Sequence, residues 1–369
     1  MNVMREEFTI DDIGYGPFFE AGRRQLGLDG FPVARVVSES RGVYRVKNAA
    51  GEYMARVTGK QMFAALSRED YPAVGDWVAI EDLGQDQAVI RGILPRRTVI
   101  KRISGDKNRA GKKSEVQVIA ANIDAALVVE SVDRDYNLNR FERYFAIARD
   151  GGVRPTIVLN KTDLLSDEEL KEKISELTSR FPGVGIVPTS TVSDAGLDAL
   201  RRYIVKGKTY GFLGSSGVGK SSLINELIGG SVIKTGDISS SSGRGKHITT
   251  MRQMCFLKSG GIVIDNPGMR EVGMAESVRG VDAIFDEIKA LAKNCRYDDC
   301  AHNREPGCAV VRAVRSGALD EEKYLNYLNL KKESEYADMD DFEKREKDRQ
   351  FGKFIKRAKK ELKNIGRKN

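Results

Sequence analysis

The chain has 369 residues, of which 40% are hydrophobic and 31% are charged, and its formal net charge is +8. This length and balance predict a soluble protein of two or three domains. The chain has no run of about 18 apolar residues, which argues against a membrane-spanning helix, and its opening MNVMREEFTI lacks a signal-peptide pattern, so we expect a cytoplasmic protein.

The positive charge is concentrated in two segments. Residues 95–115 contain 8 Lys and Arg against 2 Asp and Glu, and residues 341–369 contain 12 against 5. The rest of the chain is mildly acidic. Two basic segments on such a body favour a polyanionic partner, nucleic acid in particular, although solvated surfaces are the alternative.

Residues 1–32 show little hydrophobic pattern and are interpreted as an N-terminal extension. Residues 33–113 are predicted to form a β-barrel with a basic connector, because short runs rich in Val, Ile and Tyr recur about every ten residues between glycine-bearing turns. These runs are RGVYRVKN, GEYMARVTG, VGDWVAIED and QAVIRGILP. Four or five such strands fit an OB-type barrel, which often binds nucleic acid; a barrel without a ligand is the alternative.

The pattern changes in residues 114–275, which are predicted to form an α/β domain. Apolar runs such as IDAALVVESV, RPTIVLNKTD and RQMCFLKSG alternate with helix-like stretches such as LNRFERYFAIARDG. This alternation predicts a parallel sheet covered on both faces. Ligands of such sheets lie beyond the carboxyl ends of the strands, where the motifs described next are found.

The stretch GSSGVGKSS matches the P-loop pattern G-x-x-x-x-G-K-[ST] and lies between a predicted strand and a predicted helix. Its glycines let backbone N–H groups close around phosphate oxygens at a helix N-terminus. Lys220 is expected to reach the β- and γ-phosphates, and Ser221 to bind Mg²⁺. The residues predicted to bind nucleotide are Gly214, Ser215, Ser216, Gly217, Val218, Gly219, Lys220, Ser221 and Ser222.

The stretch NKTD also follows a strand and matches the N-K-x-D pattern of a guanine site. The Asp163 carboxylate can accept two parallel hydrogen bonds from guanine N1–H and the 2-amino group, a pair that adenine does not offer. A second base-contacting loop is expected at PTST. The other residues predicted to surround the base are Asn160, Lys161, Thr162 and Ser190.

The base motif precedes the phosphate loop by 54 residues, whereas the order is the reverse in ordinary GTPases. A Ras-like sheet has neighbouring termini, which can be joined while the chain is opened elsewhere. The order of motifs therefore predicts a circularly permuted P-loop GTPase domain, in the order G4-G5-G1-G2-G3. In this order the base motif (G4) and its second loop (G5) precede the phosphate loop (G1), the switch segment (G2) and the D-x-x-G motif (G3). The stretch GLDALRRYIVKGKTYGFLG is the expected joint.

The stretch DNPG follows the apolar strand GIVI. A D-x-x-G motif at this place predicts that Asp265 helps to hold Mg²⁺ and that Gly268 donates its N–H to the γ-phosphate. An ordinary strand-ending turn is the alternative interpretation, because Asn-Pro-Gly is also turn chemistry.

The stretch GRGKHITT lies where a switch segment belongs, and Thr249 and Thr250 are both candidate magnesium ligands. Met269 occupies the position where many GTPases have a water-orienting glutamine. His247 is therefore a catalytic candidate that could position the attacking water, with Lys220 as the second. The alternative for His247 is a loop histidine that meets an RNA phosphate or solvent.

Residues 276–369 are predicted to form a polar helical domain with a basic tail. The stretch CRYDDCAHNREPGC has the spacing C-x4-C-x-H-x5-C, and three thiolates with one imidazole complete a closed, tetrahedral zinc site. Free thiols or a redox role are the alternatives. The predicted zinc ligands are Cys295, Cys300, His302 and Cys308.

Together these motifs resemble those of the RsgA/YjeQ family, the circularly permuted GTPases of small ribosomal subunit biogenesis. The resemblance covers about residues 33–330 and rests on VGDWV, ILPRR, NKTD, GSSGVGKSS, GRGKH, DNPGMRE and the Cys/His cluster. Two positions depart from the family pattern, since Ile248 and Asn266 each stand where threonine is usual. The first departure leaves the choice of the magnesium threonine open.

The resemblance implies a GTPase that uses Mg²⁺ and one structural Zn²⁺, binds the small (30S) ribosomal subunit late in its maturation, and leaves after hydrolysis of GTP to GDP. It implies ribosomal RNA contacts for the barrel and the zinc domain, and it supports His247 as the water-positioning residue. We expect a monomer that does not act at a membrane. The competing classes are an RNA-binding module that uses GTP only as a conformational ligand, and an ATPase or kinase in which NKTD is accidental.

Overall fold

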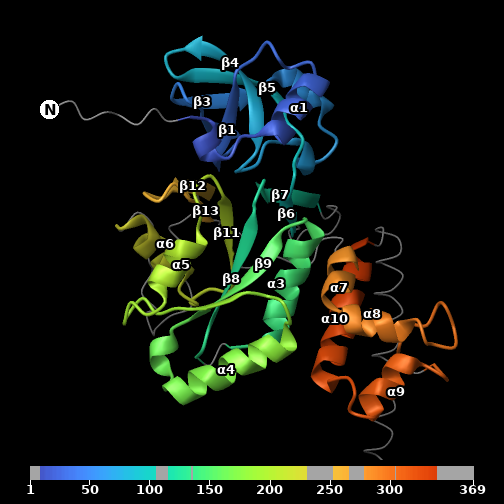
Figure 1. Ribbon diagram of the computed structural model, residues 1–369. Coiled ribbons are helices and arrows are strands. Elements are labelled where there is room, and N and C mark those ends of the chain that lie inside the picture. Colours follow the sequence, from blue (N-terminus) through green and yellow to red (C-terminus); the bar gives the residue numbers. More distant parts are fainter. Residues whose placement is uncertain are drawn as a thin grey trace, which may run out of the picture.

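The computed structural model describes residues 9–104, 115–133, 136–230, 252–265, 278–303 and 305–338. Figure 1 shows a β-barrel at one end, an α/β domain below it, and a group of helices from the last described part of the chain beside the α/β domain. The predicted succession of a small barrel, an α/β domain and a helical C-terminal part is confirmed.

The barrel contains five strands in the order β1-β2-β3-β5-β4, and β1 also pairs with β4, which closes it. Alternate residues point inward, so that Ala34 and Val36 of one strand meet Val78 and Ile80 of another in a shared core. The strands are β1 (Val33–Ser40), β2 (Val43–Lys47), β3 (Glu52–Val57), β4 (Trp77–Gly84) and β5 (Gln87–Ile93). The helices α2 (Gly59–Ala64) and η2 (Arg68–Asp70) connect β3 to β4.

The segment that precedes the barrel contains η1 (Asp11–Ile13) and α1 (Pro17–Gln25). Helix α1 begins at a proline, whose fixed φ suits the first helical position. It packs Phe19 against the fully buried Trp77 at the foot of the barrel, with ring centroids 5.9 Å apart. Helix α1 is thus packed against the start of β4, in an apolar cluster separate from the barrel core.

A hairpin connects the barrel to the α/β domain (Figure 1). It consists of β6 (Val99–Ser104) and β7 (Glu115–Ala121), which pair only with each other. Ala121 N donates to Val74 O of the barrel, and Val99 N donates to Gly151 O of the α/β domain, both at 2.9 Å. From the sequence, only a basic connector is expected here.

The α/β domain has the strand order β10-β9-β8-β11-β13-β12. All of these neighbours are parallel except β12, which is antiparallel to β13, so the predicted all-parallel sheet is mixed at that edge. The strands are β8 (Ala125–Ser131), β9 (Arg154–Asn160), β10 (Ile186–Pro188), β11 (Thr209–Leu213), β12 (Arg252–Phe256) and β13 (Ile262–Asp265). The helices are α3 (Leu138–Asp150), η3 (Thr162–Leu164), α4 (Asp167–Arg180), α5 (Leu197–Tyr203) and α6 (Lys220–Ile228).

The sheet separates two apolar layers. Val128 of β8 packs in the cluster that holds Phe145 of α3, whereas the adjacent Val129 packs in the cluster that holds Leu200 of α5 and Leu223 of α6. This division follows from the two-residue period of a strand, which sends successive side chains to opposite faces. Because both faces are buried, the strands read as continuous apolar runs in the sequence.

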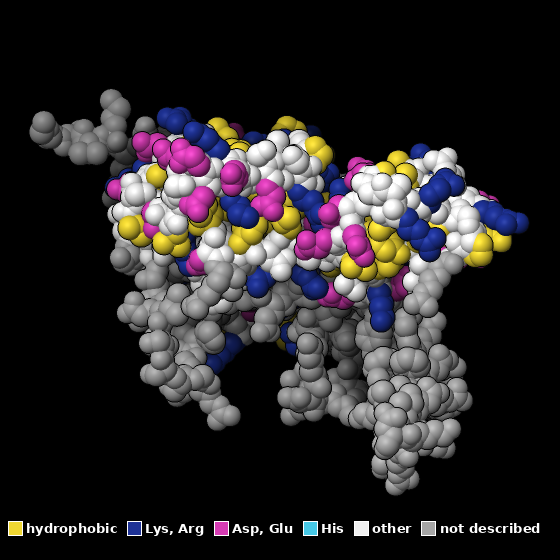
Figure 2. Space-filling view, turned by 90° about the horizontal axis from the view of Figure 1, so that it is seen from below, with side chains coloured by type: hydrophobic (Ala, Val, Ile, Leu, Met, Phe, Trp, Pro, Cys, Tyr) yellow, Lys and Arg dark blue, Asp and Glu magenta, His cyan; other side chains and the backbone are white. Residues whose placement is uncertain are grey.

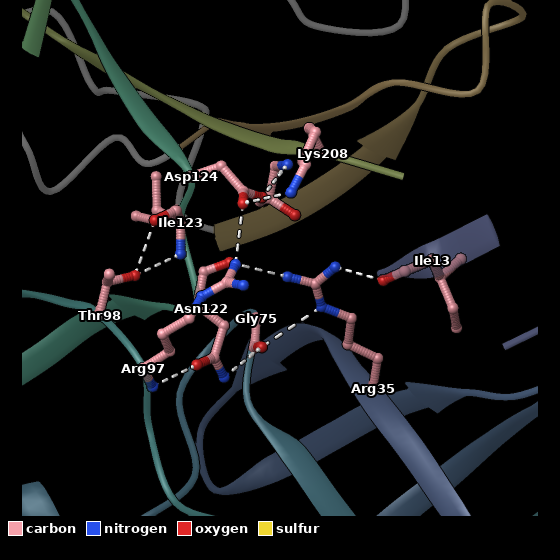
Figure 3. Close-up of polar contacts among 10 residues, drawn as sticks. Ile13, Arg35, Gly75, Arg97, Thr98, Asn122, Ile123, Asp124 and Lys208 are labelled. Carbon is pink, nitrogen blue, oxygen red and sulfur yellow. Dashed lines mark hydrogen bonds and ion pairs between the residues drawn. The ribbon is translucent and has the colours of Figure 1, made fainter. Parts of the chain in front are cut away.

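A buried guanidinium joins the barrel to its neighbours (Figure 3). Arg35 of β1 is 1% exposed and donates to Ile13 O, to Gly75 O at 3.3 Å and to Asn122 O at 3.1 Å. Asn122 in turn donates from Nδ2 to Gly75 O at 3.1 Å and accepts from Arg97 N at 2.8 Å. Burial lowers the pKa of Arg35 to about 10, which leaves it cationic at neutral pH.

Two of the C-terminal helices, α7 and α10, pack against α3. Gly280 lies so close to α3 that a Cβ there would come within 2.2 Å of Ala146 O. The buried Glu142 accepts from Asn326 and, at 2.8 Å, from Arg180, while Arg143 forms two 2.7 Å bonds with Glu333. The helices are α7 (Val278–Ile284), α8 (Asp286–Ala292), α9 (Ala309–Arg315) and α10 (Glu321–Asp338). Within the described residues, none of the helices has the length and apolarity that crossing a membrane requires.

Replacing Arg35 with Met should destabilise the protein by roughly 2–4 kcal/mol, because buried carbonyls that lose their donor cost about 1–3 kcal/mol each. Urea unfolding followed by circular dichroism measures this change. The control is Arg91→Met, which removes a half-exposed ion pair with Glu81 on the barrel surface and should change stability by less than about 1 kcal/mol. Equal effects of the two substitutions would contradict the structural role of Arg35.

Candidate nucleotide site and metal cluster

The phosphate loop runs from the end of β11 to the start of α6 at Lys220. Gly214 has φ +144°, and a Cβ there would lie 2.2 Å from Val129 O. Gly219 has φ +95°, and a Cβ there would lie 2.2 Å from Asn160 Nδ2. Both positions therefore require glycine, for conformation and for space.

Lys220 is folded over this loop. Its ammonium donates to Gly214 O at 2.7 Å and to Ser215 O. Ser221 and Ser222 follow in the first turn of α6, where backbone N–H groups have no partner within the helix. A cation above a helix N-terminus is a site suited to an anion, phosphate in particular.

Asn160 joins the base motif to the phosphate loop. Its side chain is 1% exposed, its Nδ2 donates to Val218 O at 2.9 Å, and its Oδ1 accepts from Thr189 Oγ1 at 3.1 Å. Two loops that are 54 residues apart in the sequence are thus one hydrogen bond apart in space. Thr189, part of the PTST stretch, belongs to this contact, although the sequence does not single it out.

Asp163 is exposed, and its Oδ1 accepts a hydrogen bond from Ser190 Oγ. Ser190 Oγ is itself fixed by the backbone N–H groups of Val192 at 3.0 Å and Ser193 at 3.1 Å. Thr162 Oγ1 donates to Thr189 O at 3.1 Å. The two loops predicted to contact the base are therefore adjacent and joined by hydrogen bonds, and the Asp163 residue is exposed to solvent.

Two residues near these loops were missed from the sequence. Asp133, in the loop after β8, holds the ammonium of Lys161 at 2.7 Å. Tyr144 of α3 is 5% exposed, and its hydroxyl lies 3.4 Å from Ser215 Oγ in the phosphate loop. The rule that ligands gather at carboxyl ends of strands could have flagged Asp133, whereas Tyr144 carries no local signal.

The switch residues are only partly described. Asp265, the last residue of β13, is 7% exposed. It lies beside the phosphate loop, because β13 runs parallel to β11 with Ile264 opposite Gly211. His247, Thr249, Thr250 and Gly268 lie outside the described residues. Their predicted roles stay predictions.

The Cys/His cluster has the dimensions of a tetrahedral metal site. The ligand atoms of Cys295, Cys300, His302 and Cys308 all lie within 4.8 Å of one another. His302 Nδ1 lies 3.6 Å from Cys295 Sγ and 3.7 Å from Cys308 Sγ, and these two sulfurs are 3.9 Å apart. In a tetrahedral site, zinc bond lengths of about 2.3 Å to sulfur and 2.0 Å to nitrogen predict sulfur–sulfur distances of about 3.8 Å and sulfur–nitrogen distances of about 3.5 Å.

Protonation differs among the ligands of the cluster. Burial raises the pKa of the Cys300 thiol to about 11, so a metal ion would have to displace its proton, whereas His302 and Cys295 shift in the direction that favours a ligand. Burial lowers the pKa of His302, which favours the neutral imidazole that can bind a cation. For Cys295, burial opposes ionisation, but N–H groups such as that of Ala309, 3.4 Å from Sγ, lower its pKa overall. The residues present therefore fit a structural Zn²⁺, which would tie α9 to the segment after α8.

The basic segment at residues 95–104 presents less free charge than its composition indicates. Arg96 pairs with the buried Asp76 at 2.7 Å, Arg97 with Asp124 at 2.8 Å, and Lys101 with Glu69 at 2.7 Å. The face seen from below likewise mixes acidic, basic and hydrophobic side chains (Figure 2). The part of the first basic segment that the structure describes is thus largely structural, and the second segment lies outside the described residues.

Purified protein should contain about one zinc per chain. Cys300→Ser should lose the metal and unfold the segment around α9, because the ligands hold that segment together, while the barrel keeps its structure. Metal analysis and limited proteolysis measure the two effects. Cys255→Ser is the control, since Cys255 lies on β12 outside the cluster, and it should keep the zinc. Loss of zinc from both variants would argue against the assigned ligands.

Known proteins resemble this chain over most of its length. The model of the family described as RsgA GTPase matches residues 93–275. The protein named small ribosomal subunit biogenesis GTPase RsgA 2 from Lactiplantibacillus plantarum is 40% identical over 328 residues, which are 89% of this chain and 90% of that protein. The protein named small ribosomal subunit biogenesis GTPase RsgA from Leptospira interrogans serovar copenhageni is 38% identical over 352 residues, 92% of this chain and 93% of its own.

Solved structures agree with these matches. YjeQ from Thermotoga maritima gives a TM-score of 0.59 at 26% identity and covers 82% of this chain and 98% of its own. YloQ, a circularly permuted GTPase, gives a TM-score of 0.58 at 22% identity and covers 84% of this chain and 97% of its own, which supports the fold. The predicted permuted GTPase fold is confirmed, and this chain belongs to the RsgA family of GTPases.

Proposed function

We propose that this GTPase is a late maturation factor of the small ribosomal subunit, which binds ribosomal RNA and is released when GTP is hydrolysed to GDP and phosphate. The observation that carries the nucleotide part is the 2.9 Å hydrogen bond from Asn160 to Val218 O, because it holds the base motif against the phosphate loop. The names of the relatives support the ribosomal part. The chain would act as a monomer in the cytoplasm, where small subunits are assembled.

Binding divides between the two loops. The Asp163 carboxylate would accept hydrogen bonds from guanine N1–H and the 2-amino group in place of water. Ser190, whose hydroxyl donates to Asp163 Oδ1, would keep the carboxylate oriented. The loop N–H groups between Gly214 and Ser222 would surround the phosphates, and Lys220 would exchange the carbonyls of Gly214 and Ser215 for phosphate oxygens. Because these carbonyls already hold the Lys220 ammonium at the loop, the lysine side chain would move little when the phosphates bind.

Mg²⁺ would neutralise charge on the phosphates, and the residues present fit it. Ser221 offers a hydroxyl at the start of α6, and the buried Asp265 offers a carboxylate at the end of the adjacent strand β13. Hard oxygen ligands of this kind suit Mg²⁺. Thr249 or Thr250 would supply the remaining protein ligand, and Gly268 would contact the γ-phosphate.

Phosphoryl transfer depends mainly on position and charge, so the groups that orient water set the rate. Met269 has no group that can orient water. We assign this role to His247, and we expect slow turnover in the free protein and a large increase when it binds the small subunit. In the competing hypothesis the chain binds RNA and uses GTP only as a conformational ligand.

Asp163→Asn should weaken GTP binding by about 100-fold or more, because the acceptor loses its charge and one of its two oxygens is replaced by an NH2 donor that faces the 2-amino group of guanine. Xanthosine triphosphate should bind this variant better than GTP does, since its C2 carbonyl can accept from the new amide. Competition of GTP, xanthosine triphosphate (XTP) and ATP against a fluorescent nucleotide measures this change of nucleotide specificity. Asp167→Asn, at the start of α4, is the control and should behave like the wild type. Equal competition by ATP and GTP in the wild type would favour the ATPase reading.

GTP turnover should rise strongly when small ribosomal subunits are added, and binding to the subunits should weaken as salt rises from 50 to 200 mM, as expected for phosphate contacts. His247→Ala should lower the stimulated rate by about 100-fold while the affinity for GTP stays unchanged. Single-turnover phosphate release, with and without subunits, measures the hydrolysis rates of the wild type and of His247→Ala. Unchanged hydrolysis by His247→Ala on the subunit would remove the histidine from the mechanism, and equal rates with and without subunits would contradict the coupling.

A further inference from the structure

The lysine of the base motif has an acidic partner on another strand. Lys161 Nζ lies 2.7 Å from Asp133 Oδ2, and Asp133 Oδ1 accepts from Ser131 Oγ at 2.8 Å. The side chains of Lys161 and Asp133 are 28% and 26% exposed, so water reaches the pair. Both oxygens of the carboxylate are thus used, one to fix its own position and the other to hold the lysine.

The place of this pair in the sheet connects it with both nucleotide loops. Strand β8 lies between β9, which ends in the base motif, and β11, which ends in the phosphate loop. Val132 N donates to Asn160 O at 3.1 Å, so the loop after β8 is also tied to the base motif through the backbone. Asp133 therefore lies just after the end of β8, between the base motif and the phosphate loop.

Lys161 also has an unusual backbone. Its φ of +61° puts it in the left-handed region, which non-glycine residues occupy at a cost, and η3 begins directly after it. The long side chain of a lysine loses about 2 kcal/mol of rotamer entropy when it is fully ordered. An ion pair that restrains Lys161 before the base arrives reduces the entropy that nucleotide binding must overcome.

We propose that Asp133, oriented by Ser131, is a positioning residue of the guanine site: it holds Lys161 in place and thereby sets how long guanine nucleotides stay bound. The inference rests on the proposed nucleotide site. Asp133 serves the base end of that site, whereas the phosphates lie at the loop of Gly214 to Ser222. It therefore acts equally on GTP and GDP, and it leaves the chemical step unchanged.

Asp133→Asn should speed the dissociation of mant-GDP and mant-GTP by the same factor, about two- to fivefold, as expected for the loss of a partly exposed ion pair. The KM for GTP should rise while kcat stays unchanged, which a general loss of structure would not produce. Ser131→Ala should act in the same direction with a smaller effect. Stopped-flow fluorescence and steady-state kinetics on the full chain measure these quantities.

Two controls isolate the pair. Glu81→Gln removes a similarly exposed ion pair on the barrel and should leave dissociation unchanged. In a Lys161→Ala background, Asp133→Asn should no longer speed dissociation, because its partner is absent. Thermal unfolding of each variant checks that it is folded, and Ser131→Ala provides the test if Asp133→Asn is not.

The outcomes separate the inference from the proposed function. If the wild type fails to retain mant-GDP, or if Asp163→Asn does not weaken binding, the proposed nucleotide site is wrong. If both behave as expected but Asp133→Asn releases nucleotide at the wild-type rate, or more slowly, the positioning role alone is overturned. A fall in kcat with unchanged dissociation would also overturn it.

Discussion

The amide of Asn160 is the contact on which the nucleotide site depends. Through Val218 O it holds the phosphate loop, and through Thr189 Oγ1 it holds the second loop that is predicted to contact the base. Gly219 leaves no room for a Cβ beside this amide, so the packing and the hydrogen bond specify one another. Circular permutation changes which strands are consecutive, but it leaves this contact intact, because the contact depends only on which strand ends are neighbours.

Helix α3 connects the nucleotide site with the C-terminal helices. Successive residues on a helix are about 100° apart, so neighbouring side chains can serve different partners. Glu142 and Arg143 bind Asn326 and Glu333 of α10, whereas Tyr144 reaches Ser215 of the phosphate loop. The phosphate loop and α10 therefore both contact α3. Arg35 has the corresponding structural role on the other side, where it joins the barrel to the loop before β8.

Much of the fold could be predicted because its signals are local. Buried parallel strands gave continuous apolar runs such as IDAALVVESV, and the amphipathic stretch LNRFERYFAIARDG became α3. Strand orientation has no such signal, so β12 was expected to be parallel and is antiparallel. The β6–β7 hairpin was missed because its strands lie within a segment whose charge dominated its interpretation.

By itself the sequence determined the family, the phosphate and base motifs and the metal cluster, because each is a set of residue types at a short, fixed spacing. Only the tertiary structure decided which distant residues support them. Asp133 and Tyr144 have no motif of their own and reach the site because β8 and α3 bring them there. The same holds for Arg96 and Lys101, which count as free charge in the sequence but are neutralised by partners that only folding brings near.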